Sequence, residues 1–181
     1  FGLAVANTLA AVAEGVEIVH TTVNGIGERM GNADLVHTAL ALEILYGVKL
    51  NLKYDKLYEL SKLVEKLSNV KVPPQYPAVG DNIYKVESGI IAGWLLEARK
   101  HNMPLILFPY HWKLLGHKEA SIVLGKKSGR PNLEYKVKEL GLNVPPEALD
   151  SLLVDVKRKS IALKRALTDE EFKELAQKYV R

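Results

Sequence analysis

The chain has 181 residues, of which 48% are hydrophobic and 25% are charged, and its formal net charge is +4. It contains no cysteine, so a disulfide framework is excluded and a reducing cytoplasm is the expected compartment. No apolar run is long enough to span a bilayer, and the small basic excess gives no reason to expect nucleic-acid binding. We therefore expect a globular protein with a buried core.

The first fifty residues predict a helix, a strand and a second helix, in that order. Residues 1–15 carry apolar side chains at helical spacing and end at a glycine. Residues 16–23 are mostly β-branched, which favours a strand. A glycine-rich loop follows at residues 24–32, and residues 35–45 again show helical spacing. A strand that leads through such a loop into a helix is where α/β proteins place their chemistry.

Four polar side chains of this loop are the candidates for chemistry. Asn32 could offer a side-chain oxygen to a hard cation, or it could cap the helix that follows. Glu28 could act on a substrate, or it could form an ion pair with the neighbouring Arg29. Asn24 lies at a tight turn, where asparagine more often satisfies the backbone than contacts a ligand. The residue types alone leave these alternatives open.

The remainder of the chain is predicted to be mainly helical. Residues 51–71 show helical spacing, and the proline-rich stretch that follows marks a boundary. Residues 103–110 are apolar but contain two prolines, which favours a loop or an edge segment, and residues 121–124 are a short strand candidate. The other predicted helices are 90–99, 132–140, 146–166 and 168–180, the last with a capping box formed by Thr168 and Glu171.

Three blocks of sequence are distinctive when they are taken together and in order. They are Phe-Gly-Leu-Ala-Val-Ala-Asn-Thr at residues 1–8, Val-Asn-Gly-Ile-Gly-Glu-Arg-Met-Gly-Asn at residues 23–32 and Gly-Lys-Lys-Ser-Gly-Arg at residues 125–130. The three blocks resemble the 2-isopropylmalate/homocitrate/citramalate synthase family. That family is part of the superfamily of metal-dependent barrel enzymes that includes 3-hydroxy-3-methylglutaryl-CoA lyase.

The resemblance implies an α/β fold, the C-terminal part of a (β/α)8 TIM barrel followed by a mostly helical α+β linker region. Residues 1–50 would be the last βα units of the barrel, and residues 51–181 would be the appended linker region. A whole barrel needs roughly 250 residues, so we expect the C-terminal portion of a longer enzyme. The family also exchanges elements between subunits, which implies a homodimer.

The resemblance further implies a Claisen-type condensation of acetyl-CoA with a 2-oxo acid, assisted by a divalent cation (Mg, Mn or Zn). Asn32 matches an asparagine at the family's metal site, whose other ligands, an acidic residue and a His-x-His pair, would precede residue 1. Glu28 matches a glutamate beside the substrate, and we assign it a catalytic role. Asn24 and Arg29, from the same loop, are assigned to substrate binding. The expected partners are thus a 2-oxo acid and an acyl-CoA, with neither a nucleic acid nor a membrane.

The linker region departs from the family pattern at three positions. The histidine expected after the Glu-Ser-Gly-Ile motif is Ile91, the family's tyrosine falls on Leu107, and Lys127 replaces a histidine in the last block. An aliphatic side chain cannot move a proton. Tyr110 and His111 lie a few residues from Leu107, and we predict that they substitute for the tyrosine in substrate binding.

These departures leave two other functions open. A carbon–carbon lyase or aldolase of the same superfamily is favoured by the missing histidine. It is opposed by the missing cysteine, because lyases of the methylglutaryl type carry one in this loop. A non-catalytic fragment or partner-binding subunit is favoured by the absence of the preceding metal ligands. Release of CoA thiol from acetyl-CoA and a 2-oxo acid would separate the synthase from both.

Overall fold

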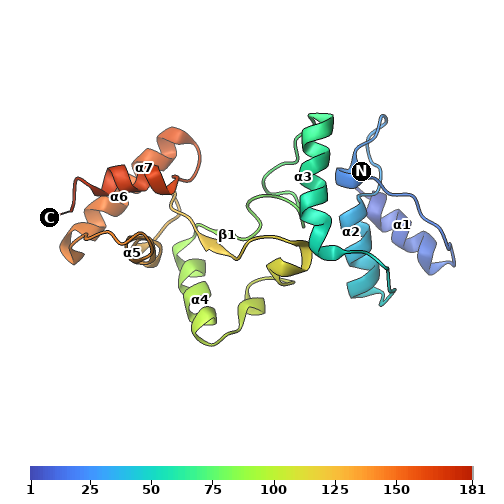
Figure 1. Cartoon of the computed structure of the whole chain (residues 1–181), viewed down its shortest axis with the longest axis horizontal. Helices are drawn as coiled ribbons and strands as arrows, with labels where there is room; N and C mark the ends of the chain where they lie inside the picture. Colours follow the sequence, from blue (N-terminus) through green and yellow to red (C-terminus); the bar gives the residue numbers. More distant parts are fainter. Residues whose placement is uncertain (181) are drawn as a thin grey trace. The chain divides into compact units, whose positions relative to one another are not determined.

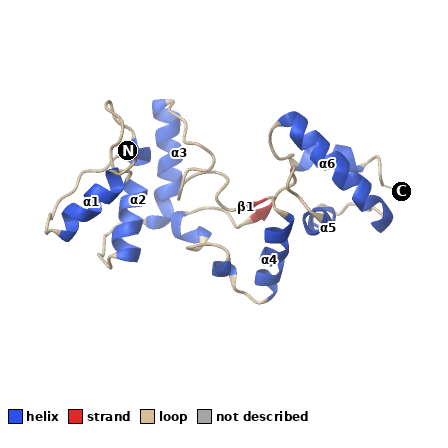
Figure 2. Cartoon of the chain, turned by 180° about the vertical axis from the view of Figure 1, so that it is seen from behind, coloured by secondary structure: helices blue, strands red, loops and turns tan. Residues whose placement is uncertain are grey.

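The computed structural model describes residues 1–180, which form two compact units (Figure 1). The N-terminal unit comprises Phe1–Ile83 and the short segment Trp112–Lys118, and the C-terminal unit comprises Tyr84–His111 and the described residues from Glu119 onward. Figure 2 shows helices and loops throughout, with strand confined to one place in the C-terminal unit. No helix among residues 1–180 has the length and apolar character needed to cross a bilayer.

The helices of the N-terminal unit lie where the sequence predicts them. They are α1 (Ala4–Ala13), α2 (Leu35–Leu40) and α3 (Leu57–Ser68). A π-helical turn, Ala41–Leu45, extends α2 to its predicted end. α3 is shorter than predicted, because a 3-10 turn at Tyr54–Lys56 precedes it and Asn69 ends it in the left-handed region with φ 57°.

The strand predicted at residues 16–23 is wrong. Only Thr22 makes a β-bridge in this segment, a single parallel bridge to Asp34, and a 3-10 turn follows at Val23–Gly25. The β-branched side chains suit a strand, but a strand also needs a neighbour to pair with its backbone N–H and C=O groups. No other strand among residues 1–180 lies alongside this segment, so no ladder forms. The described chain is mostly helical with one small parallel sheet, and the barrel remains an expectation.

The helix α2 begins at a cap two residues after Asn32, the residue that the sequence offered as an alternative cap. The buried carboxylate of Asp34 accepts a hydrogen bond from the backbone N–H of His37 through Oδ1, at 2.9 Å. Asp34 is therefore the N-cap residue, and the alternative that Asn32 caps this helix is wrong. The ring of His37 lies against the backbone, with Nε2 at 2.8 Å from the carbonyl oxygen of Pro77.

The start of α2 holds buried oxygen atoms that lack a hydrogen-bond partner among residues 1–180. They are Thr22 Oγ1, Asp34 Oδ2 and Thr38 Oγ1. We expect Thr38→Val, which replaces an orphaned hydroxyl by a methyl group of the same shape, to raise the free energy of unfolding in urea by about 1 kcal/mol. The control is Thr8→Val, because the hydroxyl of Thr8 donates to the carbonyl of Ala4 at 3.0 Å. A loss of stability with Thr38→Val would contradict this interpretation.

The C-terminal unit combines helices with a two-stranded parallel sheet. Its elements are β1 (Lys85–Val86), α4 (Gly89–Lys100), β2 (Ser121–Ile122), α5 (Arg130–Glu139), α6 (Leu149–Leu163) and α7 (Asp169–Ala176). The predicted helices and the predicted strand are thus confirmed, with ends that differ by a few residues. The segment 103–110 contains only a 3-10 turn, Pro104–Ile106, as its prolines predict.

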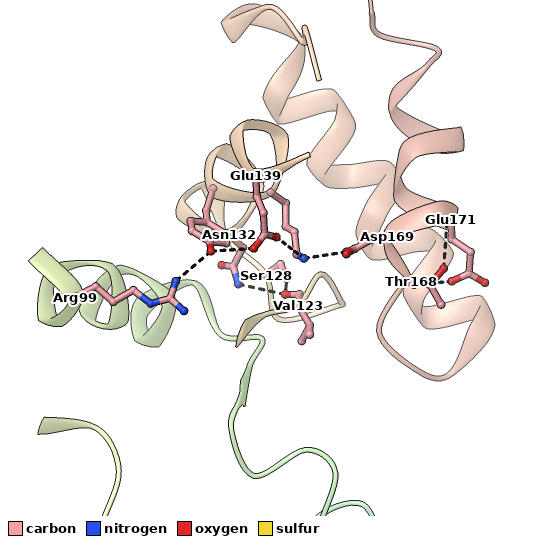
Figure 3. A network of polar contacts seen from close by, with 10 residues as sticks. Arg99, Val123, Ser128, Asn132, Glu139, Thr168, Asp169 and Glu171 are labelled. Carbon is pink, nitrogen blue, oxygen red and sulfur yellow. Dashed lines mark hydrogen bonds and ion pairs between the residues drawn. The ribbon is translucent and has the colours of Figure 1, made fainter. Parts of the chain in front are cut away.

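The last three helices of this unit share an apolar cluster that includes Leu133, Leu152 and Phe172. Figure 3 shows part of the polar network of the same unit, including Glu139 and Asp169. The amino group of Lys136 bonds to Glu139 at 2.6 Å and to Asp169 at 2.8 Å. Burial by itself would lower the pKa of Lys136, but the two carboxylates outweigh burial and raise it. The charge on this buried amine is thereby retained between α5 and the start of α7.

The capping box predicted at α7 is confirmed. The backbone N–H of Glu171 donates to Thr168 Oγ1 at 3.2 Å, and the backbone N–H of Thr168 donates to Glu171 Oε2 at 2.9 Å (Figure 3). Arg165 donates to both carboxylate oxygens of Glu171, at 2.7 and 2.8 Å. These bonds, with that of Arg165 the strongest influence, lower the pKa of Glu171 to about 2.

The lowered pKa of Glu171 predicts a pH dependence of stability. A carboxyl with a depressed pKa contributes stability above its unfolded value, near pH 4.3, and loses it as the pH falls toward 2. We expect Glu171→Gln to flatten the decline of unfolding free energy across this range, measured by urea denaturation at stepped pH. Glu170→Gln, at the exposed neighbouring position, should leave the decline as it is. Equal profiles for both variants would contradict the assignment.

Candidate functional site

The glycine-rich loop lies in the N-terminal unit, between the 3-10 turn at Val23–Gly25 and α2. Its backbone is unusual from the start, because Asn24 and Gly25 have φ values of 60° and 64°. Both values lie in the left-handed region, which asparagine tolerates better than most residues and glycine adopts freely. The sequence Asn-Gly therefore suits this turn.

The side chain of Asn24 fastens the turn to α3. Its Nδ2 donates to the backbone carbonyl of Ser61 at 3.0 Å, and the hydroxyl of Ser61 donates to its Oδ1 at 2.6 Å. Ser61 is completely buried. Both polar ends of Asn24 are thus occupied by one residue of α3, 37 positions along the chain.

Asn32 lies at the other end of the loop and folds back over it. Its Nδ2 donates to the backbone carbonyl of Ile26 at 3.0 Å. Gly27 makes this possible, because a Cβ atom there would lie 2.0 Å from Nδ2 of Asn32 and 2.8 Å from its Cγ. The hydrogen bond fixes which way the amide faces, and Oδ1 of this exposed side chain has no bond to another described residue. An amide oxygen presented in this way fits a hard divalent cation.

Glu28 and Arg29 are exposed at the tip of the loop. Among residues 1–180, no ion pair joins the two side chains, so both charged groups face solvent. Two charges in this position can meet a polar substrate without first breaking a bond to each other. Their predicted roles, catalytic for Glu28 and substrate-binding for Arg29, remain predictions.

The other two predicted substrate-binding residues, Tyr110 and His111, belong to the C-terminal unit. The backbone carbonyl of Tyr110 accepts a hydrogen bond from the hydroxyl of Tyr84 at 3.2 Å, and burial raises the pKa of the Tyr110 phenol. His111 is half-buried. The structure thus gathers four of the six predicted site residues in one loop and places these two in the other unit.

The positions that depart from the family pattern lie in apolar or backbone-bonded surroundings. Leu107 lines a cavity of about 350 Å³ together with Trp94, Met103 and Ile106. At Lys127 it is the backbone N–H that donates to Glu87 Oε1, at 3.0 Å. The cavity is also lined by Glu97 and His101, so titratable groups lie beside Leu107, but the side chain of Leu107 itself cannot transfer a proton.

A contact between two glycines gives a structural reason why the Glu-Ser-Gly-Ile and Gly-Lys-Lys-Ser-Gly-Arg motifs occur together. A Cβ atom on Gly89 would lie 2.8 Å from the Cα of Gly129, so the two backbones touch. Near this contact, Asn132 donates to the carbonyl of Glu87 at 2.9 Å. Ser128 donates to the carbonyl of Val123 at 3.3 Å (Figure 3). These residues hold the linker fold, which is a sufficient reason for their presence.

Clusters of acidic and histidine side chains give no second candidate for a metal site. No group of three or more His, Cys, Asp or Glu residues within 1–180 is arranged to hold a metal ion. Asn32 remains the metal ligand predicted from the sequence.

Comparison with known proteins shows which family the segment containing the loop matches. Residues 1–64 match the family model described as HMGL-like. A Methanocaldococcus jannaschii protein named 2-isopropylmalate synthase is 48% identical over 145 residues, which are 80% of this chain and 27% of that protein. The chain is a relative of the 2-isopropylmalate and citramalate synthases.

Two further relatives extend the similarity over most of the chain. An Archaeoglobus fulgidus protein named as a probable 2-isopropylmalate synthase is 45% identical over 157 residues, 87% of this chain and 30% of that protein. A Methanopyrus kandleri protein whose name assigns it as an (R)-citramalate synthase is 42% identical over 177 residues, 98% of this chain and 33% of that protein. This synthase relative thus spans about a third of the length of the proteins it matches.

Sequence reasoning missed two residues that shape the loop of this synthase relative. Asp34 was available from the sequence, since aspartate directly before a periodic run is a standard helix start. Ser61 gave no signal, because a serine in the middle of a helical pattern does not indicate which distant side chain it will bond. The role of Gly27 in admitting Asn32 likewise depends on a contact that only the folded loop shows.

Proposed function

We propose that this chain belongs to a metal-dependent acyltransferase that condenses acetyl-CoA with a 2-oxo acid. The observation that carries the proposal is the arrangement of Asn32, whose amide is fixed by the carbonyl of Ile26 so that Oδ1 is left exposed above Gly27. This arrangement lies within the block that matches the family. The names of the relatives as 2-isopropylmalate and citramalate synthases support the reaction class.

Asn32 would supply one oxygen ligand to a divalent cation, Mg, Mn or Zn. Such a cation, when bound, polarises the 2-oxo group of the substrate. The other ligands, an acidic residue and a His-x-His pair, are expected from the family and not from these residues. A binding site that is completed by other segments agrees with the lack of a three-residue acidic or histidine cluster within 1–180.

The charged tip of the loop is assigned to the substrate. The guanidinium of Arg29 is free to bind the carboxylate of a 2-oxo acid through two parallel hydrogen bonds. The exposed carboxylate of Glu28 is placed in the catalytic role, as a group that can hold a proton beside the substrate. Asn24 keeps a role in substrate binding through its remaining amide hydrogen, and Tyr110 and His111 would contribute from the C-terminal unit.

The proposed reaction balances as a condensation followed by a hydrolysis. A base removes a proton from the methyl group of acetyl-CoA, and the resulting carbanion attacks the keto carbon of the 2-oxo acid. A carbon–carbon bond forms, and the former keto oxygen takes up a proton. Water then cleaves the thioester, which releases CoA as the thiol and leaves a new carboxylate.

The architecture of the whole enzyme is part of this proposal. Residues 1–50 would complete a (β/α)8 barrel, and residues 51–181 would form the linker region of a homodimer. The boundary at residue 50 is the expected end of the barrel. The two compact units are instead defined by contacts within this chain, so their boundary need not coincide with it. The cytoplasm remains the proposed compartment, in keeping with a sequence without cysteine.

Two residues of the C-terminal unit support the two alternative functions. Leu107 faces an apolar cavity in place of the family's tyrosine, and Ile91 stands where the histidine is expected. Loss of both groups favours a lyase or aldolase that does not use them, or a partner-binding subunit without activity.

The proposal is tested by mixing the protein with acetyl-CoA, MgCl2 or MnCl2 and a panel of 2-oxo acids, and by following free thiol. A synthase releases thiol only when both substrates and the cation are present, and EDTA stops the release. A lyase instead releases a 2-oxo acid or an acyl-CoA from the condensed product. Absence of thiol release with every 2-oxo acid, together with no cleavage, would leave the partner-binding subunit and overturn the proposal.

A further inference from the structure

A buried residue of α3, Ser61, bonds to the start of the loop. Ser61 is 0% exposed, and it is the one residue to which both polar atoms of the Asn24 side chain are bonded. A buried serine hydroxyl that donates at 2.6 Å to an amide oxygen is a strong contact, and such contacts are costly to leave unmade. This point therefore determines where the loop begins relative to α3.

A short stretch of chain leads from that point to the residue that orients Asn32. Asn24 is held in the left-handed conformation, inside a turn that closes where the N–H of Gly25 donates to the carbonyl of Thr22 at 3.2 Å. The carbonyl of Ile26, two residues beyond Asn24, accepts from Nδ2 of Asn32 at 3.0 Å. Because only Gly25 separates Asn24 from Ile26 in the chain, we expect a displacement of Asn24 to displace the acceptor that orients Asn32.

We propose that Ser61 is a positioning residue which, through Asn24, holds the loop in the conformation that presents Oδ1 of Asn32 to a metal ion. This inference rests on the proposed function, since it supposes that Asn32 contacts the cation. Ser61 touches neither substrate nor cation. It acts at a distance by fixing the carbonyl against which Asn32 is oriented.

The two hydrogen bonds between Asn24 and Ser61 can be removed one at a time or together, so the variants should differ in the size of their effect. Ser61→Ala removes the bond from the hydroxyl but keeps the backbone carbonyl that Asn24 donates to. Asn24→Ala removes both bonds. The matched control on the same helix is Ser68→Ala, because the hydroxyl of Ser68 is exposed and donates to the carbonyl of Val64 at 2.7 Å.

The decisive readout is Mn²⁺ binding by the holoenzyme, measured by water-proton relaxation and by broadening of the Asn32 side-chain amide signal in its NMR spectra. We expect affinity to fall about tenfold in Ser61→Ala, further in Asn24→Ala and not at all in Ser68→Ala. Ser61→Thr, which keeps a hydroxyl, should recover most of the affinity. Faster amide exchange across residues 25–32 should accompany the loss.

Two results would overturn the inference, and they differ in what else they affect. If Asn32→Ala weakens Mn²⁺ binding while Ser61→Ala and Asn24→Ala leave it unchanged, Asn32 is oriented without Ser61 and the inference alone fails. If Asn32→Ala itself leaves Mn²⁺ binding unchanged, the metal role in the proposed function fails, and the inference falls with it.

Discussion

Replacement of Phe172 by alanine is expected to lower the free energy of unfolding by about 3–5 kcal/mol. Phe172 is 1% exposed and lies in the apolar cluster shared by α5, α6 and α7. The loss combines the transfer energy of the ring with the cavity that it leaves. Since domains are stable by only about 5–15 kcal/mol, this variant should be marginal at physiological temperature.

The measurement is urea denaturation followed by circular dichroism, with two companion variants. Phe172→Leu keeps much of the apolar volume and should cost less than half as much. Phe1→Ala removes a fully exposed ring and should change stability by less than about 0.5 kcal/mol. A similar, small effect for Phe172→Ala and Phe1→Ala would show that the cluster is not the core of this unit.

Removal of Asn32 is expected to have the largest effect on function. If Asn32 contacts the cation, Asn32→Ala should weaken metal activation by about 10- to 100-fold, the range found when a group that supports a metal site is lost. Asn32→Asp keeps an oxygen in place and should retain part of the activity. Stability should change little, because the side chain is exposed and makes one hydrogen bond to Ile26.

The dependence of rate on Mg²⁺ concentration measures this effect, with Asn51→Ala as the control at an exposed position outside the loop. Gly27→Ala supplies an independent route to the same outcome, since its Cβ atom would occupy the space of the Asn32 amide. Metal dependence that is identical in the wild type, Asn32→Ala and Gly27→Ala would remove Asn32 from the site.

Periodicity was sufficient for most of the helices, and the reason is physical. In α3 and α6 the apolar spacing is a local property, so the sequence predicts both helices, α6 to within three residues at each end and α3 to within six at its start. The same approach failed for residues 16–23, because formation of a strand depends on a pairing partner elsewhere in the chain. Its side chains suit a sheet, but the partner strand that would complete the ladder is not among residues 1–180.

At the candidate site, too, local features could be predicted from the sequence and long-range contacts could not. The loop and its four polar residues could be found from glycine spacing and from the family resemblance. What the sequence could not supply was the way these residues are held, because the bond between Asn24 and Ser61 joins positions 37 residues apart. The sequence brought the helix cap to within two residues of Asp34. An Asn-Ala-Asp segment offers two capping residues, and only the folded geometry decides between them.

The central claim, that this protein forms a carbon–carbon bond between an acyl-CoA and a 2-oxo acid, is tested most directly by isotope labelling. The native protein is incubated with Mg²⁺, acetyl-CoA labelled with ¹³C at the methyl carbon and a 2-oxo acid labelled with ¹³C at the keto carbon. We predict a one-bond ¹³C–¹³C coupling in the NMR spectrum of the product, lost when EDTA is added. Labelled acetate and unchanged 2-oxo acid, or no reaction with any 2-oxo acid, would contradict the claim.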